Sequence, residues 1–202
     1  MGPRARRLIV AAQRACFWFA RHWLALANGF NLAVLAGSAA VPALAAAGLH
    51  GLAEPVFASY LLVCHQLPYR SFFLFGQQMA MCQRDVAIYA SMALAGILFA
   101  LDRDRWSPLA WRWYLLALLP IGIDGTTQLL GFRESNWELR LATGTIFGVA
   151  TVWLAYPYLE RFAADILSTE TRGLGEALTR RPAISAQGPG RGAQDVQNRK
   201  AT

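Results

Sequence analysis

Charged side chains are scarce in this chain. Only 15% of its 202 residues are charged, whereas 55% are hydrophobic, and the apolar residues come in long blocks rather than at amphipathic spacing. This scarcity argues against a soluble domain and favours a membrane protein. The chain also lacks an internal repeat, a Gly-rich phosphate loop, a nucleotide fingerprint and a readable Ser/His/Asp arrangement, so its sequence carries none of those functional motifs.

Acidic residues are fewer than basic ones. The chain has 12 Asp and Glu residues against 19 Lys and Arg residues, which gives a formal net charge of +7. In a soluble protein this excess would suggest nucleic acid or another anionic partner. Here most basic residues flank the apolar blocks, where they act as an orientation signal. We therefore expect no nucleic-acid partner.

Four apolar blocks are long enough to cross a bilayer, which takes roughly 20 residues per helix. The predicted fold class is all-α, an integral membrane bundle of four transmembrane helices. A shorter apolar run at 55–63 is predicted to be an outer interfacial or re-entrant half-helix. The four predicted spans are 24–49, 86–101 with a start near Cys82, 107–131 with Ser107 as N-cap and Gly131 as C-cap, and 135–160 with a capping box at Ser135 and Glu138.

Basic residues concentrate at the N-terminus, in the turn between the second and third spans, and after the fourth span. By the positive-inside rule these segments lie in the cytoplasm, with both termini inside and the polar clusters outside. We expect an integral plasma (inner) membrane protein in contact with membrane lipids, with an uncleaved first span and a tendency to form homo-oligomers. The predicted domains are a basic cytoplasmic segment 1–23, a transmembrane domain 24–160, and a largely disordered cytoplasmic tail 161–202.

The first polar cluster combines potential metal ligands. Cys64 and His65 end the half-helix, and Cys82 and Asp85 stand three residues apart at the start of the second span. Two thiols, an imidazole and a carboxylate form a set that zinc or another divalent metal can use. The helix N-terminus is also expected to lower the pKa of Cys82. On an oxidising side, however, Cys64 and Cys82 could instead form a structural disulfide, and residue chemistry leaves both readings open.

The second polar cluster places ionisable residues inside the membrane. Asp124 and Gln128 share one face of the third span, and Arg140 lies one turn into the fourth, where Gly144 and Gly148 form a face for close helix packing. An intramembrane charge normally faces a partner or a wet cavity, so the sequence predicts an Asp124–Arg140 ion pair.

At these residues the chain resembles the prokaryotic membrane proteins of the domain-of-unknown-function 2085 family. That family name implies no established activity. Its pattern is Cys-x-Arg-Cys, whereas this chain has Asp85 in place of the second Cys and Ala87 in place of a Gly. Asp can replace Cys as a metal ligand but not as a partner in a disulfide, so this difference favours a metal site more than residue chemistry alone does. The matching positions are Cys64-His65-Gln66, Pro68, Arg70-Ser71-Phe72, Cys82, Arg84, Tyr89, Asp124-Gly125, Thr127-Gln128, Arg140 and Thr143-Gly144.

The leading functional hypothesis is an outward-facing site, a metal-dependent enzyme or binding protein for an anionic or lipid-linked small molecule. Asp124 or Glu134 would move a proton if the site hydrolyses its substrate. One alternative is a small transporter or flippase with an Asp124, Gln128 and Arg140 relay, and another is a non-catalytic assembly factor with a Cys64–Cys82 disulfide. The predicted substrate-binding residues are Arg70, Arg84, Gln128 and Arg140.

Overall fold

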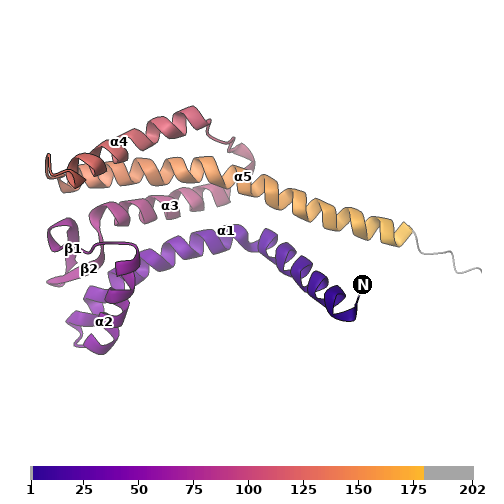
Figure 1. Ribbon diagram of the computed structural model, residues 1–202, viewed down its shortest axis with the longest axis horizontal. Coiled ribbons are helices and arrows are strands. Elements are labelled where there is room, and N and C mark those ends of the chain that lie inside the picture. The colour runs from indigo at the N-terminus through magenta and orange to yellow at the C-terminus, as the bar shows by residue number, and fades with distance from the viewer. Residues whose placement is uncertain (1, 180–202) are drawn as a thin grey trace, which may run out of the picture. The chain divides into compact units, whose positions relative to one another are not determined.

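The computed structural model describes residues 2–179, which are mainly helical (Figure 1). The chain divides into two compact units, Met1–Leu167 and Ser168–Thr202. The last helix continues into the second unit, whose described residues form its C-terminal end. Residues 180–202, which belong to the predicted disordered tail, lie outside the described residues. The helices are α1 (Pro3–Ala46), α2 (His50–Ser59), α3 (Gln83–Leu101), α4 (Trp111–Leu129) and α5 (Trp137–Thr179).

Three helices in the described part of the chain are long and apolar enough to cross a membrane. They lie where the first, second and fourth spans were predicted, at Pro3–Ala46, Gln83–Leu101 and Trp137–Thr169. The predicted third span forms the 19-residue helix α4, which is less apolar because it carries Arg112, Asp124 and a run of polar residues near its end. The prediction of a mainly helical protein is therefore confirmed, and three of the four predicted spans are helices with the length and composition to cross a membrane.

The all-α prediction is wrong in one respect, because a small antiparallel hairpin separates the two halves of the first polar cluster, Cys64 with His65 and Cys82 with Asp85. Strands β1 (Ser71–Leu74) and β2 (Gln77–Cys82) pair with Leu74 opposite Gln77. Phe75 and Gly76 form the connection with φ angles of 54° and 74°, the left-handed pair that a two-residue hairpin requires. The sequence contained a signal for this hairpin, because a run of Phe residues, which favour strands, is followed by a glycine that suits a turn.

The ends of the helices test three further predictions. The short helix expected at 55–63 begins earlier, as α2, and continues as a single 3-10 turn at Tyr60–Leu62. α3 has Cys82 as its N-cap, as predicted. α5 is capped by Asn136 rather than by Ser135, since the Asn136 Oδ1 accepts a 2.9 Å hydrogen bond from the Leu139 N–H.

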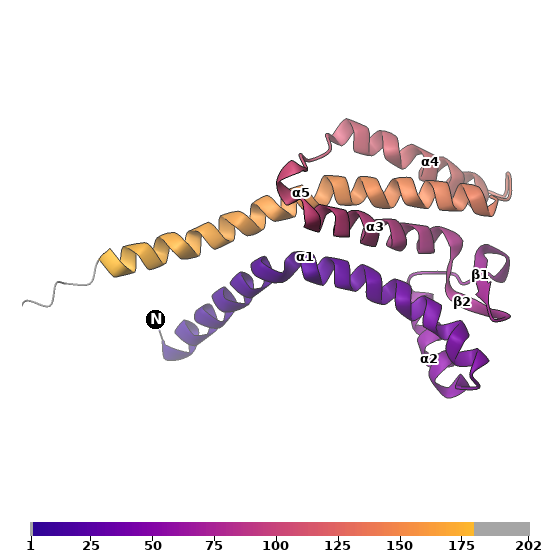
Figure 2. The same ribbon diagram turned by 180° about the vertical axis from the view of Figure 1, so that it is seen from behind.

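Within the first unit, α3 lies between α1 and α5, with α4 on the other side of α5 (Figures 1 and 2). Helices α1, α3 and α5 share an aromatic core of Trp23, Phe99 and Tyr156. These rings pack edge to face with their centroids 5.3–6.2 Å apart. It lies at the end of α3 farthest from the hairpin. Polar side chains occupy the other end of the bundle.

Glycines bring α5 close to the N-terminal half of α3. A Cβ on Gly144 would lie 2.6 Å from the Arg84 carbonyl oxygen, and one on Gly148 would lie 2.7 Å from the Ile88 carbonyl oxygen. The predicted small-residue packing face is therefore confirmed. It holds the first turn of α3 against α5, where the polar residues of the two predicted clusters meet.

Candidate metal and anion site

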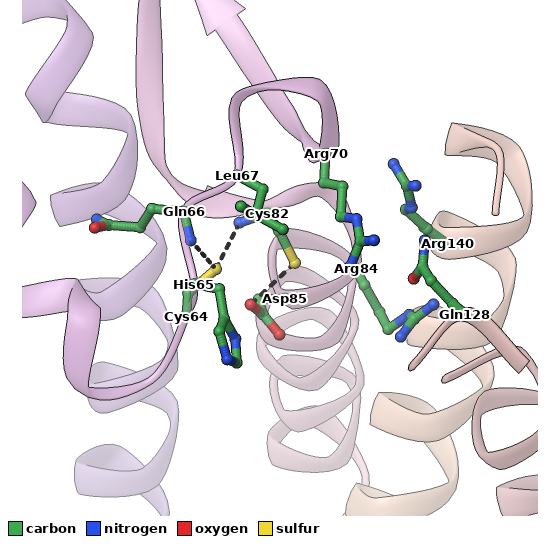
Figure 3. A pocket seen from close by; sticks show the side chains of 10 residues that line it. All are labelled: Cys64, His65, Gln66, Leu67, Arg70, Cys82, Arg84, Asp85, Gln128 and Arg140. Carbon is green, nitrogen blue, oxygen red and sulfur yellow. Dashed lines mark hydrogen bonds between the residues drawn. The ribbon is translucent and has the colours of Figure 1, made fainter. Parts of the chain in front are cut away.

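Residues from both predicted clusters line one cavity of about 190 Å³ (Figure 3). The cavity lies where α3 and α5 begin and α4 ends, so the prediction that both clusters share one end of the bundle is confirmed. Figure 3 shows the sulfur and carboxylate groups on one side and the arginines with Gln128 on the other. The lining residues are Cys64, His65, Gln66, Leu67, Arg70, Cys82, Arg84, Asp85, Gln128 and Arg140.

Three of the four predicted metal ligands converge. The Sγ atoms of Cys64 and Cys82 and a carboxylate oxygen of Asp85 all lie within 4.8 Å of one another. Tetrahedral zinc with bonds of about 2.3 Å to sulfur would hold two sulfurs roughly 3.8 Å apart. Because the observed spacing exceeds this value by at most about 1 Å, small side-chain movements would let the three groups contact one ion.

His65 stands apart from this group. It lines the same cavity and follows Cys64 directly, but its side chain is exposed and its ring nitrogens are not among the atoms that lie within 4.8 Å of one another. The structure therefore brings together three predicted ligands and leaves the fourth at the cavity wall. A local reason is that Cys64 points into the protein, so its neighbour in this loop faces outward.

Hydrogen bonds give the two thiols different acidities. Hydrogen bonding with the Cys82 thiol lowers the pKa of Cys64, and the N–H groups of Gln66 and Cys82, 3.5 and 3.2 Å from the Cys64 Sγ, add to this effect. The interaction with Cys64, burial and the adjacent Asp85 carboxylate together raise the pKa of Cys82. The prediction of a lowered Cys82 pKa is therefore wrong, and Cys64 is the more acidic of the two thiols.

Gln66 fixes the loop that carries Cys64, a role that the sequence analysis did not assign. Its backbone is in the left-handed region at φ 52°, and its buried side-chain amide donates to the carbonyls of Phe57 at 2.7 Å and Ala80 at 3.0 Å. Gln78 in turn donates to the Gln66 carbonyl at 2.7 Å. The loop is thus tied to both α2 and β2.

Arg140 is the most deeply buried cation of the cavity, with its side chain 5% exposed. Its guanidinium donates to the Gln83 Oε1 at 3.1 Å and lies 3.8 Å from the Glu134 carboxylate. Arg70 lies 4.0 Å from the same carboxylate. Glu134 is itself 72% exposed, so it stands at the rim and balances only part of the cationic charge.

The predicted Asp124–Arg140 ion pair is wrong. Asp124 is buried and forms ion pairs with Arg84 and with Arg133, the latter at 2.7 Å, and it accepts a 3.0 Å hydrogen bond from the Ser135 hydroxyl. Arg84, in the first turn of α3, takes the place at Asp124 that was predicted for Arg140. Arg133, from the loop between α4 and α5, and Ser135, which was predicted as a cap of the fourth span, complete this cluster.

A family model described as a predicted membrane protein (DUF2085) matches residues 64–154. An uncharacterized protein of Methanocaldococcus jannaschii is 44% identical over 105 residues, which cover 50% of this chain and 67% of that protein. An uncharacterized protein of Methanothermobacter thermautotrophicus is 38% identical over 88 residues, covering 43% of this chain and 78% of that protein. The chain belongs to the DUF2085 family. No solved structure matches it.

The region matched by the DUF2085 model contains every residue that lines the cavity. It also contains the two candidates for proton transfer. Asp124 lies behind Arg84, outside the cavity lining, with both carboxylate oxygens engaged. Of the two, Glu134 is the one whose carboxylate lies beside the lining residues Arg70 and Arg140, at 4.0 and 3.8 Å.

Proposed function

We propose that this DUF2085 protein binds a divalent metal ion, zinc or one of similar preference, next to an anionic ligand held by arginines. The observation that carries the proposal is the convergence of Cys64, Cys82 and Asp85 in the same cavity as Arg70 and Arg140. Thiolate and carboxylate are suitable zinc ligands, and guanidinium forks match the oxygens of carboxylate or phosphate. The two halves of the cavity therefore suit a metal ion and an anion in contact.

His65 is the candidate fourth ligand, because a rotation of its exposed side chain can turn the ring toward Cys64. If it remains at the wall, the fourth position is open to water or to the anion, as in catalytic zinc sites. An enzyme would also need a group that moves a proton. Glu134 at the rim is better placed for this role than Asp124, whose two ion pairs make it a positioning residue for Arg84.

We further propose that α4 is a fourth span and that the cavity faces outward in the inner membrane, with both termini cytoplasmic. The hydroxyls of Thr126 and Thr127 support this arrangement, because each donates to a carbonyl one turn earlier in α4, at 2.7 Å. Reporters fused after Gln78 or Ser135 should read as extracytoplasmic, and one after Arg105 as cytoplasmic. A cytoplasmic reading at Gln78 would reverse the orientation.

Metal analysis of the purified protein tests the central proposal. We expect about one equivalent of zinc per chain, lost in Cys64→Ser and Cys82→Ser and retained in Asp85→Cys, because thiolate binds zinc at least as well as carboxylate. The matched control is Cys16→Ser, since Cys16 is an exposed cysteine on α1 outside the cavity. Loss in His65→Ala would add His65 to the ligands. Equal zinc content in all the variants would refute the site.

A second candidate function is a non-catalytic assembly factor with a Cys64–Cys82 disulfide. The closeness of the two sulfurs favours it, although both cysteines are free thiols in the structure. Intact-mass analysis without reductant separates the two proposals: a metal-free, folded chain with a Cys64–Cys82 bridge supports the disulfide. The transporter alternative gains no support, because the proposed relay is interrupted where Asp124 pairs with Arg84 instead of Arg140.

A further inference from the structure

The arginine side of the cavity contains several buried donors without a partner. The Nε atoms of Arg70, Arg84 and Arg140 and the Nε2 of Gln128 are all buried and make no hydrogen bond within the part of the chain that the structure describes. All four belong to residues that line the same cavity. An unpaired buried donor is costly, and four such donors on residues around one cavity favour a ligand that only accepts hydrogen bonds.

The size and charge of the cavity restrict this ligand. A volume of about 190 Å³ accommodates a tetrahedral oxyanion together with a few waters. Guanidinium groups bind phosphate oxygens in pairs, and the N-terminus of α3, which begins at Gln83, favours negative charge at the same place. A phosphate monoester, with three unsubstituted oxygens, satisfies more of the donors than a diester with two.

A second cavity, of about 510 Å³, lies between α1, α3 and α5, and Asp85 lines both cavities. Its walls are mainly apolar and include Phe30, Val63, Ile88 and Phe147. From Asp85 to Met92, another lining residue, it follows α3 for about 10 Å at 1.5 Å per residue. A polar cavity thus lies next to a larger, mainly apolar cavity, with Asp85 as the lining residue that they share.

We propose that the ligand is a membrane lipid with a terminal phosphate monoester. Its phosphate lies among Arg70, Arg84, Arg140 and Gln128, and its first hydrocarbon segment lies between α1, α3 and α5. This inference rests on the proposed anion-binding function and names its ligand class. The metal ion, when present, faces the phosphate from the Cys64, Cys82 and Asp85 side.

Binding of defined lipids to the purified protein in detergent tests the proposal. The probes are dioleoyl phosphatidic acid, dioleoyl phosphatidylcholine, dioleoylglycerol, and the chainless glycerol 3-phosphate and inorganic phosphate. Native mass spectrometry and thermal shift should show phosphatidic acid binding at least about tenfold more tightly than any other probe, a difference of about 1.4 kcal/mol. Equal binding of phosphatidylcholine would mean only a non-specific lipid surface, and equal binding of a chainless phosphate would mean a site for soluble anions. Either result overturns the proposal.

Matched variants separate the two cavities. Arg70→Gln should weaken phosphatidic acid binding about tenfold, whereas Arg112→Gln, which removes an exposed cation of α4, should leave it unchanged. Phe30→Gln should weaken it similarly, whereas Leu32→Gln, at an exposed apolar position of the same helix outside the cavity, should not. Equal effects of Phe30→Gln and Leu32→Gln would refute the chain-binding cavity.

The zinc content of the same preparations distinguishes this inference from the proposed function. Specific binding of phosphatidic acid to metal-free protein would support the lipid site and refute the metal site. Stoichiometric zinc without preference for phosphatidic acid would refute the lipid inference and leave the metal proposal standing.

Discussion

Replacing Asp124 with Asn removes the only charge that stands between Arg84 and Arg133 in this cluster. The Asp124 side chain is 2% exposed, whereas those of Arg84 and Arg133 are 18% and 42% exposed. Breaking a fully buried pair costs roughly 3–5 kcal/mol, and the partial exposure of the arginines reduces this to about 2–4 kcal/mol. For a chain of this size, roughly 2–4 °C per kcal/mol gives a fall in Tm of about 4–16 °C.

Thermal unfolding in detergent, followed as a double-mutant cycle, identifies the partner. Asp124→Asn combined with Arg84→Gln should recover about 0.5–3 kcal/mol relative to the sum of the single changes, because the second change removes the stranded charge. Asp124→Asn combined with Arg140→Gln should be additive within about 0.5 kcal/mol. Glu138→Gln, at an exposed position in the first turn of α5, serves as the neutral control. Coupling to Arg140 but not to Arg84 would refute the cluster described above.

Two further changes test the supports of the site. Gly144→Ala should destabilise the protein by about 1–3 kcal/mol in the same assay, because its Cβ meets the α3 backbone, whereas Gly122→Ala, at an open helical position, should be neutral or stabilising by up to about 1 kcal/mol. Gln66→Ala should lower zinc affinity about 10- to 100-fold, measured by competition with a chelator, because it releases the loop that carries Cys64. An unchanged affinity would show that the loop needs no such support.

The sequence predicted the features that depend on local composition. Apolar runs indicated the helices, and the spacing of Gly144 and Gly148 indicated a face of α5 for close helix packing, since both follow from the residues of a single segment. The grouping of Cys64, Cys82 and Asp85 was also accessible, because membrane topology places both ends of the intervening segment on one side.

The pairing of charges could not be predicted, because it depends on the rotation of each helix. Asp124 and Arg140 lie on neighbouring spans, yet the side of α3 that carries Arg84 is the one that faces α4. The predicted pKa shift of Cys82 was wrong for a related reason. Its position at a helix N-terminus is visible in the sequence, but its contacts with Cys64 and Asp85 are set by the hairpin and the preceding loop.

The first turn of α3 connects α4 to two of the candidate metal ligands. Cys82, Arg84 and Asp85 occupy a single stretch of backbone, yet Arg84 is bound to α4 while its two neighbours face the Cys64 loop. Any sliding or tilting of α4 would pull on Arg84 and so displace the sulfur and carboxylate beside it. Through this turn, a movement of α4 that preserves the Arg84–Asp124 ion pair would reach Cys82 and Asp85 along the backbone.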